Sequence, residues 1–532
     1  MAFAKTPEGL LTKDEYDTCL GKLKFHDGLP DGDTIQKVYD NLDRSRATSV
    51  FLDMIPLASV EALRTGFVEV GCDACHKVVL FEKLMDSHSL FLTGNTDTVY
   101  VASILTLGTD GPTVIEVPGG AGPGTVNDAF FRFVNDMGGP GPDKGAGGKY
   151  LIVAPGYEGK LPEGYHVFHS PTYTNFVVNR GFLKDGRPDS AAANWKAGLK
   201  IYPLARAGNP PKMEFINVSG KVMNTIHSND FHFFKEVDDV IQREPIEFLD
   251  PELRGRLKAI GIEKGKPFAP DERMTRLLKE GVAIGNATAR AMCFAPRGAC
   301  RMYSEDSEWL TFYAGWDYQW LEQGARNLDA RTRYFYLATL NTPAMVLKMV
   351  GVGSQYALLA RDGKHQYLDG GKCYSLTLPP NVPAKDFWSV VIYDAQHRSM
   401  LQTEQVSPGR NSVRHPDIKP NSDGSVTIWF APSAPEGKEG NWIQTIPEKT
   451  WFMLLRVYGP TDDAEKQKPK TVARRGPSKA TMLWLGLFWW RFWLVVPFSP
   501  WFKVKPPGKP KSFGSTLFGP TLGLDWWFDP LF

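Results

Sequence analysis

The sequence is poor in the features that define several large protein classes. It has 6 cysteines in 532 residues, and its 61 basic and 59 acidic side chains leave a net charge of +2. So few cysteines do not form the disulfide framework of a small secreted protein, and this charge balance gives no basis for nucleic-acid binding. The first residues also lack the apolar segment of a secretory signal, which predicts a reducing compartment.

Familiar catalytic signatures are absent too. The sequence contains no G-x-S-x-G turn, no G-x-x-x-x-G-K-[ST] phosphate loop and no H-E-x-x-H zinc motif. Cys72, Cys75 and His76 form the C-x-x-C-H pattern of c-type haem attachment. Short motifs often arise by chance, however, and no second pair of zinc ligands accompanies this one. We therefore predict no bound metal and no other cofactor.

What the chain has instead is 40 prolines and 51 glycines spread along its length, as expected for many turns between short strands. Segments rich in β-branched and aromatic residues predict strands. A helical period predicts helices, the first over 34–68 with a break at Pro56. Strands are predicted at 98–107, 113–117, 130–134, 150–153, 165–169, 176–179, 374–378, 387–393 and 426–430, and further helices at 231–242, 251–260, 270–292, 309–324 and 342–349.

Two stretches of the sequence resemble each other. Residues 147–168 and 370–400 both run Gly-Gly-Lys, strand, proline-containing loop and aromatic-led strand. This repeat predicts an internal duplication of one β unit, with Gly148 equivalent to Gly371.

Several longer motifs point to one family. They are Asn95-Thr-Asp-Thr98 followed by Val99-Tyr100, the connector 261–291 and the dense stretch 369–424. With these motifs the chain resembles the bacterial DUF1254/DUF1214 proteins over about residues 30–460. The resemblance implies a mainly β fold of two jelly-roll-like β-sandwiches with helical additions, and it supplies no reaction. The expected parts are an N-terminal helical region 1–94, a first sandwich 95–220, a helical connector 221–349, a second sandwich 350–460, and a linker with a tryptophan-rich tail 461–532.

A polar cluster opens the first β region. Asn95, Asp97, Thr98 and Tyr100 bring an amide, a carboxylate and hydroxyls to the start of a predicted strand. Such groups can orient a hydroxylated ligand or complete a metal shell. The same residue types also cap turns by bonding local backbone, and both interpretations stay open.

A second polar cluster follows the strand predicted over 387–393. Asp394 and His397 could form a general base pair, and Arg398 could hold an anionic group through two hydrogen bonds. A solvated turn with an internal ion pair is the alternative. The candidate catalytic residues are therefore Asp97 and these three.

Tyr356 and Trp388 complete the candidate ligand-binding set with Asn95, Thr98 and Tyr100, although aromatic residues in strands more often belong to a core. The expected function is the binding of a small polar or carbohydrate-like ligand in or between the two sandwiches, with catalysis undecided. The alternative is a non-catalytic structural or glycan-binding protein, and self-assembly into a homo-oligomer is compatible with either.

The tail predicts a membrane location. Residues 482–498 are apolar on every face apart from Arg491, and basic residues flank them on both sides. Seventeen residues with a central charge suit an in-plane or re-entrant anchor better than a full span. We therefore expect association with a membrane surface, with the β domains on the cytoplasmic side.

Overall fold

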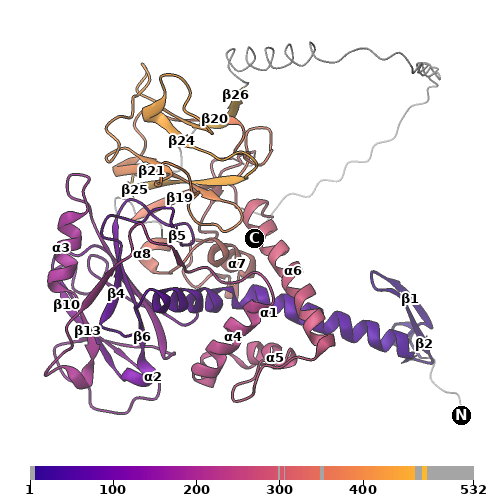
Figure 1. Ribbon diagram of the computed structural model, residues 1–532. Helices are drawn as coiled ribbons and strands as arrows, with labels where there is room; N and C mark the ends of the chain where they lie inside the picture. Colours follow the sequence, from indigo (N-terminus) through magenta and orange to yellow (C-terminus); the bar gives the residue numbers. More distant parts are fainter. Residues whose placement is uncertain (1–5, 298–299, 305, 348–352, 462–469, 476–532) are drawn as a thin grey trace, which may run out of the picture. The chain divides into compact units, whose positions relative to one another are not determined.

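The computed structural model describes residues 6–297, 300–304, 306–347, 353–461 and 470–475. Helices account for 27% and strands for 29% of the chain. The fold is therefore mixed, and the prediction of a mainly β protein needs this correction. The helical share is large partly because helix α1 alone, Gly32–Glu69, has 38 residues (Figure 1).

Helix α1 begins where the sequence predicts and runs on through Pro56, where a break was predicted. The carboxylate of Asp31 caps its start by accepting a hydrogen bond from the backbone N–H of Thr34. Proline has no N–H, so the carbonyl of Leu52 loses its usual partner one turn later. The hydroxyl of Thr332 donates to that carbonyl at 3.4 Å. Packing of the connector on α1 thus satisfies the group that Pro56 leaves free.

The sequence predicted a helical N-terminal region, but this region also contains strands. A three-stranded sheet of β1, β2 and β3 precedes α1, and two further strands, β4 and β5, follow it before residue 95. These strands span β1 Glu15–Thr18, β2 Gly21–His26, β3 Leu29–Pro30, β4 Lys77–Leu80 and β5 Ser89–Leu90.

The first β unit contains two sheets that share an apolar core, built from residues such as Val101, Ile115 and Tyr150. The larger sheet has the strand order β14-β4-β6-β12-β8-β9, and the smaller sheet has the order β11-β10-β7-β13. Strand β4 lies in the larger sheet, so this unit begins before residue 95. The other strands are β6 Val99–Thr106, β7 Thr113–Val117, β8 Gly124–Asp128, β9 Phe133–Met137, β10 Gly148–Val153, β11 His166–His169, β12 Thr174–Gly181, β13 Lys200–Pro203 and β14 Glu214–Asn217.

The second β unit likewise has two sheets around one core, with Leu376, Val390 and Met453 among its members. Its larger sheet has the order β16-β19-β25-β21-β22, and its smaller sheet has the order β24-β23-β20-β26. The strands are β16 Leu310–Thr311, β19 Ser354–Leu359, β20 Cys373–Leu378, β21 Ala384–Asp394, β22 Gly409–Asn411, β23 Val426–Ala431, β24 Trp442–Gln444, β25 Trp451–Pro460 and β26 Lys470–Arg475.

The two β units have the same strand topology. When strands are taken in chain order from β4 and from β16, omitting the short β5, β17 and β18, the orders β4-β6-β12-β8-β9 and β11-β10-β7-β13 become those of the second unit. Strand direction agrees as well, because β10 pairs with β11 in parallel and β23 pairs with β24 in parallel, while the other corresponding pairs are antiparallel.

This correspondence supports the predicted duplication but corrects its alignment. Gly148 opens β10, whose counterpart is β23, whereas Gly371 precedes β20, whose counterpart is β7. The two Gly-Gly-Lys stretches therefore occupy different places in the two copies. A turn followed by a strand is a local pattern that recurs at several corners of such a unit, so it does not fix the register of a repeat.

Both faces of the larger sheets are buried. Along β6, Val101 contributes to the core of its own unit, while Tyr100 and Ala102 point to the opposite face. That opposite face joins a central apolar cluster, which also receives Leu454 from β25 and residues of the helices. The central cluster is where the two β units and the connector meet, and it positions the site described below.

The helical connector packs on α1, chiefly through helix α6. Gly281 and Gly285 lie one turn apart on α6, and a Cβ atom at either position would come within 2.6 Å of Ala47 or Phe51 of α1. Glycine here allows the two helix backbones to approach closely. The segment predicted as helix over 309–324 instead forms β16 and turns, because Trp316 and Trp320 adopt positive φ angles. The remaining elements are α2 Leu107–Asp110, α3 Asp189–Gly198, α4 His232–Arg243, α5 Pro251–Ala259, α6 Glu272–Phe294, α7 Leu328–Leu337, α8 Pro343–Val346, β15 Met223–Asn224, β17 Leu321–Glu322, β18 Ala325–Arg326 and short 3-10 turns at Glu8–Leu10, Leu204–Arg206, Ile246–Phe248 and Glu439–Asn441.

Candidate functional site

A small cavity lies in the central cluster, where the two β units and the connector converge. Its volume is about 40 Å³, which is room for about three waters. Its walls come from β6 and β12 of the first unit, β19 and β25 of the second, the loop 91–95, and the connector. The polar or aromatic lining residues are Phe91, Thr93, Asn95, Tyr100, Arg180, Phe312, Tyr313, Tyr334, Thr339, Tyr356 and Arg456.

Each β unit contributes one arginine–tyrosine pair to this cavity. Arg180 of β12 lies opposite Tyr100 of β6 in the strand register, and Arg456 of β25 lies opposite Tyr356 of β19. Opposite residues in an antiparallel ladder share a face. Each guanidinium accordingly lies near the ring of its partner, at 5.1 Å for Arg180 and 5.6 Å for Arg456. Because β12 corresponds to β25 and β6 to β19, the two pairs are equivalent features of the duplicated unit.

Arg456 is a cation enclosed in the protein interior. Its residue is 2% exposed, and its guanidinium lies 5.6 Å and 5.7 Å from the ring centroids of Tyr356 and Tyr393. One terminal nitrogen donates to the carbonyls of Thr93 and Gly94, at 2.9 and 3.4 Å, while Nε and the other terminal nitrogen have no protein partner. A buried charge is costly unless other groups stabilise it.

Arg180 faces the same cavity but is only half-buried. Its terminal nitrogen contacts the sulfur of Met345 at 3.6 Å, and sulfur is a weak acceptor. Within the part of the chain that the structure describes, neither Arg180 nor Arg456 forms an ion pair with a carboxylate. Burial acts against the charge of Arg456, but the surrounding tyrosines and the Asp97 carboxylate together raise its pKa.

The tyrosines of the cavity do not supply the missing negative charge. Burial raises the pKa of Tyr100, Tyr313 and Tyr334 above the ordinary value of 10.0. Their hydroxyls are therefore protonated at neutral pH, and each can donate or accept a hydrogen bond. Two guanidinium groups and several neutral hydroxyls form the polar part of the lining, and apolar side chains such as Phe91 and Leu340 form the rest.

The first predicted polar cluster lies beside the cavity and only partly in its lining. Asn95 and Tyr100 line it, whereas Asp97 and Thr98 do not. Asp97 is 1% exposed and accepts hydrogen bonds from Asn411 at 3.0 Å and from the Tyr458 hydroxyl at 3.2 Å. Those partners belong to the second β unit, so Asp97 holds the two units together instead of capping a local turn.

The second predicted cluster is a local turn network. Asp394 accepts from His397 and Lys449, and these hydrogen bonds hold its pKa below the usual range although burial alone would raise it. The other ring nitrogen of His397 lies 2.7 Å from the hydroxyl of Ser399. Ser399 is 0% exposed, so this carboxylate–imidazole–hydroxyl chain cannot present a nucleophile to a substrate.

Arg398 and Trp388 also lie away from the cavity lining. Arg398 is fully buried, with its guanidinium 4.0 Å from the ring centroid of Tyr336 and a hydrogen bond of 3.2 Å to that hydroxyl. Trp388 belongs to the core of the second β unit. Tyr356 does line the cavity. Sequence reasoning thus named Asn95, Tyr100 and Tyr356 among the lining residues and missed both arginines.

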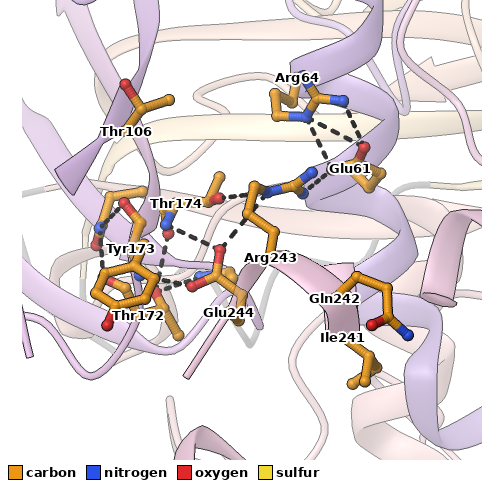
Figure 2. A network of polar contacts seen from close by, with 12 residues as sticks. Glu61, Arg64, Thr106, Thr172, Tyr173, Thr174, Ile241, Gln242, Arg243 and Glu244 are labelled. Atoms are coloured by element: carbon orange, nitrogen blue, oxygen red, sulfur yellow. Dashed lines mark hydrogen bonds and ion pairs between the residues drawn. The ribbon is translucent and has the colours of Figure 1, made fainter. Parts of the chain in front are cut away.

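A contrasting polar network ties α1 and α4 to the first β unit (Figure 2). Glu61 of α1 is hydrogen-bonded to Arg64 and Arg243, and Glu244 accepts from the backbone N–H groups of Tyr173 and Thr174. Here both arginines are neutralised by a carboxylate. The network therefore acts as a structural link, in contrast to the two cavity arginines, which have no carboxylate partner.

Both cysteines of the C-x-x-C-H stretch lie in the protein interior. Cys72 and Cys75 are free, buried thiols that belong to different apolar clusters, the central one and the core of the first unit. The Cys72 thiol donates to the carbonyl of Lys77. Burial raises the pKa of both thiols, to about 11 for Cys72 and about 12 for Cys75. Thiols directed into separate cores do not fit attachment of one haem. Among the described residues, no three His, Cys, Asp or Glu side chains gather closely enough to hold a metal.

Fold and site together define a class of protein: two copies of a β unit, joined by helices, around a small cavity with two unneutralised arginines. A family model for a protein of unknown function, DUF1254, matches residues 77–203, and a second one, DUF1214, matches residues 353–462. The chain belongs to the family in which these two domains occur in tandem. The first matched segment begins with β4, in agreement with the start of the first β unit.

A solved structure supports the fold. The VPA0106 protein from Vibrio parahaemolyticus has a TM-score of 0.50 with this chain and is 19% identical in sequence, and the match covers 82% of this chain and 100% of that one. An uncharacterized protein from Burkholderia cenocepacia is 13% identical with a TM-score of 0.36, covering 84% of this chain and 91% of its own. No curated protein sequence matches the chain.

Proposed function

We propose that the protein binds a small molecule in the cavity between its two β units. The observation that carries this proposal is the pair of equivalent arginines facing one cavity without a carboxylate partner. Natural proteins pair or hydrogen-bond their buried charges, and a bound ligand would complete the partners that these groups lack. Sites at the junction of domains are also the commonest places for small ligands.

The size of the cavity limits which ligands it can hold. Room for about three waters suits a compound of a few heavy atoms and speaks against a sugar ring, the carbohydrate-like ligand considered from the sequence. The proposal includes the architecture of the two units: each pair of sheets around its own core is a jelly-roll-like sandwich. Two such sandwiches would form the walls of the site, and the connector would close it.

A cavity-filling variant tests this function. Ala338 lines the cavity, so Ala338→Met should occupy its space at a cost of about 1–3 kcal/mol from overpacking. Ala205→Met, at an exposed position, is the matched control. Thermal melts of the full chain against a panel of small neutral and charged metabolites should find compounds that stabilise wild type and the control but not Ala338→Met.

Native mass spectrometry of the protein from its own host provides the second measurement. A retained small molecule should appear in wild type and be lost in Ala338→Met. If no compound stabilises wild type and no retained mass is found, or if Ala338→Met behaves like wild type, the cavity is not a binding site.

We further propose that the protein associates with the cytoplasmic surface of a membrane through residues 482–498, which lie outside the described residues. None of the helices that the structure describes is long and apolar enough to cross a bilayer. Flanking basic residues and tryptophans support a surface anchor. The full chain should sediment with membranes and need detergent, whereas a chain ending at Asp462 should stay in the supernatant; two proteins that both stay there without detergent would refute the anchor.

A further inference from the structure

The duplicated arginine–tyrosine pair identifies the chemical class of the ligand. We propose that the cavity binds a small monocarboxylate with a short apolar body, whose carboxylate is held by Arg180. This inference rests on the proposed function, since it assigns the ligand of the same cavity. It follows from the charge, the donors and the shape of the lining, which are considered in turn.

Charge favours an anion. Arg180 and Arg456 both line the cavity, and arginine stays protonated at every physiological pH. Arg414 is a third cation nearby, since its Nη1 donates to the carbonyl of Thr96 at 2.6 Å. Asp97 is the acidic group that influences Arg456 and Arg414, and it is already engaged by Asn411 and Tyr458. Three cations and one carboxylate leave the surroundings of the cavity with a positive excess.

The two arginines have different parts in holding the anion. Nε and Nη1 of Arg456 are buried and without a partner, but its other terminal nitrogen already donates to the loop at Thr93 and Gly94. Arg456 therefore contributes mainly a fixed positive charge. Arg180 is less buried, and its neighbours are the Met345 sulfur, the Tyr100 ring and the Tyr356 hydroxyl, none of which carries a negative charge. Its planar group can therefore form two parallel hydrogen bonds with one carboxylate.

The remaining walls favour an organic acid over an inorganic anion. Leu92, Leu340, Met345 and Leu454 give the cavity an apolar side, and four tyrosine rings flank it. A phosphate or sulfate has no apolar part that could pack against these side chains. A carboxylate with two or three carbons matches the polar end and the apolar side of the lining together.

Titration calorimetry on the full chain tests the inference, with propionate, its neutral analogue propionamide, and inorganic phosphate in a buffer free of other carboxylates. Wild type should bind one propionate per chain, with propionamide and phosphate at least about 30-fold weaker. Arg180→Gln should weaken propionate binding at least about 20-fold, and Arg180→Lys should retain part of it, because lysine keeps the charge but not the planar fork. The exposed Arg206→Gln is the control and should bind like wild type.

The outcomes separate the two proposals. If propionamide binds as tightly as propionate, Arg180→Gln changes neither, and Ala338→Met abolishes both, the cavity is a small-molecule site of another class and only the present inference falls. Phosphate binding tighter than propionate also overturns the carboxylate assignment. If wild type binds none of the three probes, the carboxylate inference falls, and the metabolite panel and native mass spectrometry decide separately whether the cavity binds anything.

Discussion

The two β units share their strand order, yet the equivalent arginines Arg180 and Arg456 have different surroundings. In the second unit, Arg456 is enclosed by tyrosine rings and donates to the carbonyls of Thr93 and Gly94. In the first unit, Arg180 remains half-buried, with a methionine sulfur as its neighbour. Duplication thus supplied two equivalent cations. One of them became part of the interior and the other remained available to a ligand.

The largest effect that tests this difference should come from Arg456→Gln. The shorter side chain leaves a cavity between Tyr356 and Tyr393 and removes the donor to two buried carbonyls. We expect the free energy of unfolding to fall by about 2–4 kcal/mol, whereas Arg180→Gln should cost less than about 1 kcal/mol. Urea denaturation of both variants measures this. Equal losses would mean that the two arginines do not differ as described.

Asp97→Ala should produce the next largest effect, because Asp97 joins the two units. Its removal leaves the amide of Asn411 and the hydroxyl of Tyr458 without an acceptor in the interior. We expect a loss of about 2–3 kcal/mol in the free energy of unfolding. Propionate binding, measured below the melting temperature, should fall far less than in Arg180→Gln. An Asp97→Ala protein that melts normally but no longer binds would instead make Asp97 a ligand-binding residue.

These contacts also show how far the sequence could predict the molecule. Segments rich in β-branched and aromatic residues placed β7 and β11 almost at their observed bounds, since strand propensity is a local property. The polar cluster at Asn95 and the resemblance at Tyr100 led to one side of the cavity. Arg180 escaped notice because nothing near it in sequence is unusual. Arg180 becomes part of a site only through the strand register that places it opposite Tyr100. Long-range strand pairing also brings the second arginine–tyrosine pair, Arg456 and Tyr356, to the same cavity.

The duplication was detectable in the sequence, but its alignment was not. The repeated Gly-Gly-Lys stretches suggested the wrong correspondence, because local backbone geometry selects the residues of each turn. The equivalence of Arg180 and Arg456 follows from strand order over whole units. The path of α1 through Pro56 was likewise hidden, since the donor to Leu52 comes from Thr332, 280 residues later.

A pH-dependent contact joins the first unit to the connector. Asp136 of β9 accepts from the Thr342 hydroxyl at 2.6 Å, and burial raises its pKa from the ordinary 3.8 to about 6. Between these values the folded protein keeps a proton that the unfolded chain has released, so stability should decline as pH rises from about 4 to 6 and stay lower above it.

Asp136→Asn should remove this decline and leave the protein about 1–2 kcal/mol more stable than wild type at pH 8. Denaturation at pH 4, 6 and 8 measures it, with the exposed Asp185→Asn as the control. Parallel profiles for wild type and Asp136→Asn would show that Asp136 is not the titrating group.

The smallest effect should come from Tyr356→Phe. The Tyr356 hydroxyl accepts a hydrogen bond from Ser354 at 2.8 Å, and its loss should cost about 0.5–1.5 kcal/mol while the ring still flanks Arg456. Tyr157→Phe, at an exposed position, should lie within about 0.5 kcal/mol of wild type. A loss above 3 kcal/mol would mean that the hydroxyl, and not the ring, stabilises the buried cation.

A crystal structure of the full chain grown with saturating propionate would show which groups the ligand contacts. We expect one propionate in the cavity, with its carboxylate oxygens within hydrogen-bond distance of Arg180 and its carbons against Leu340 and Leu454. A cavity that holds only water under these conditions, or a propionate bound elsewhere, would contradict this expectation.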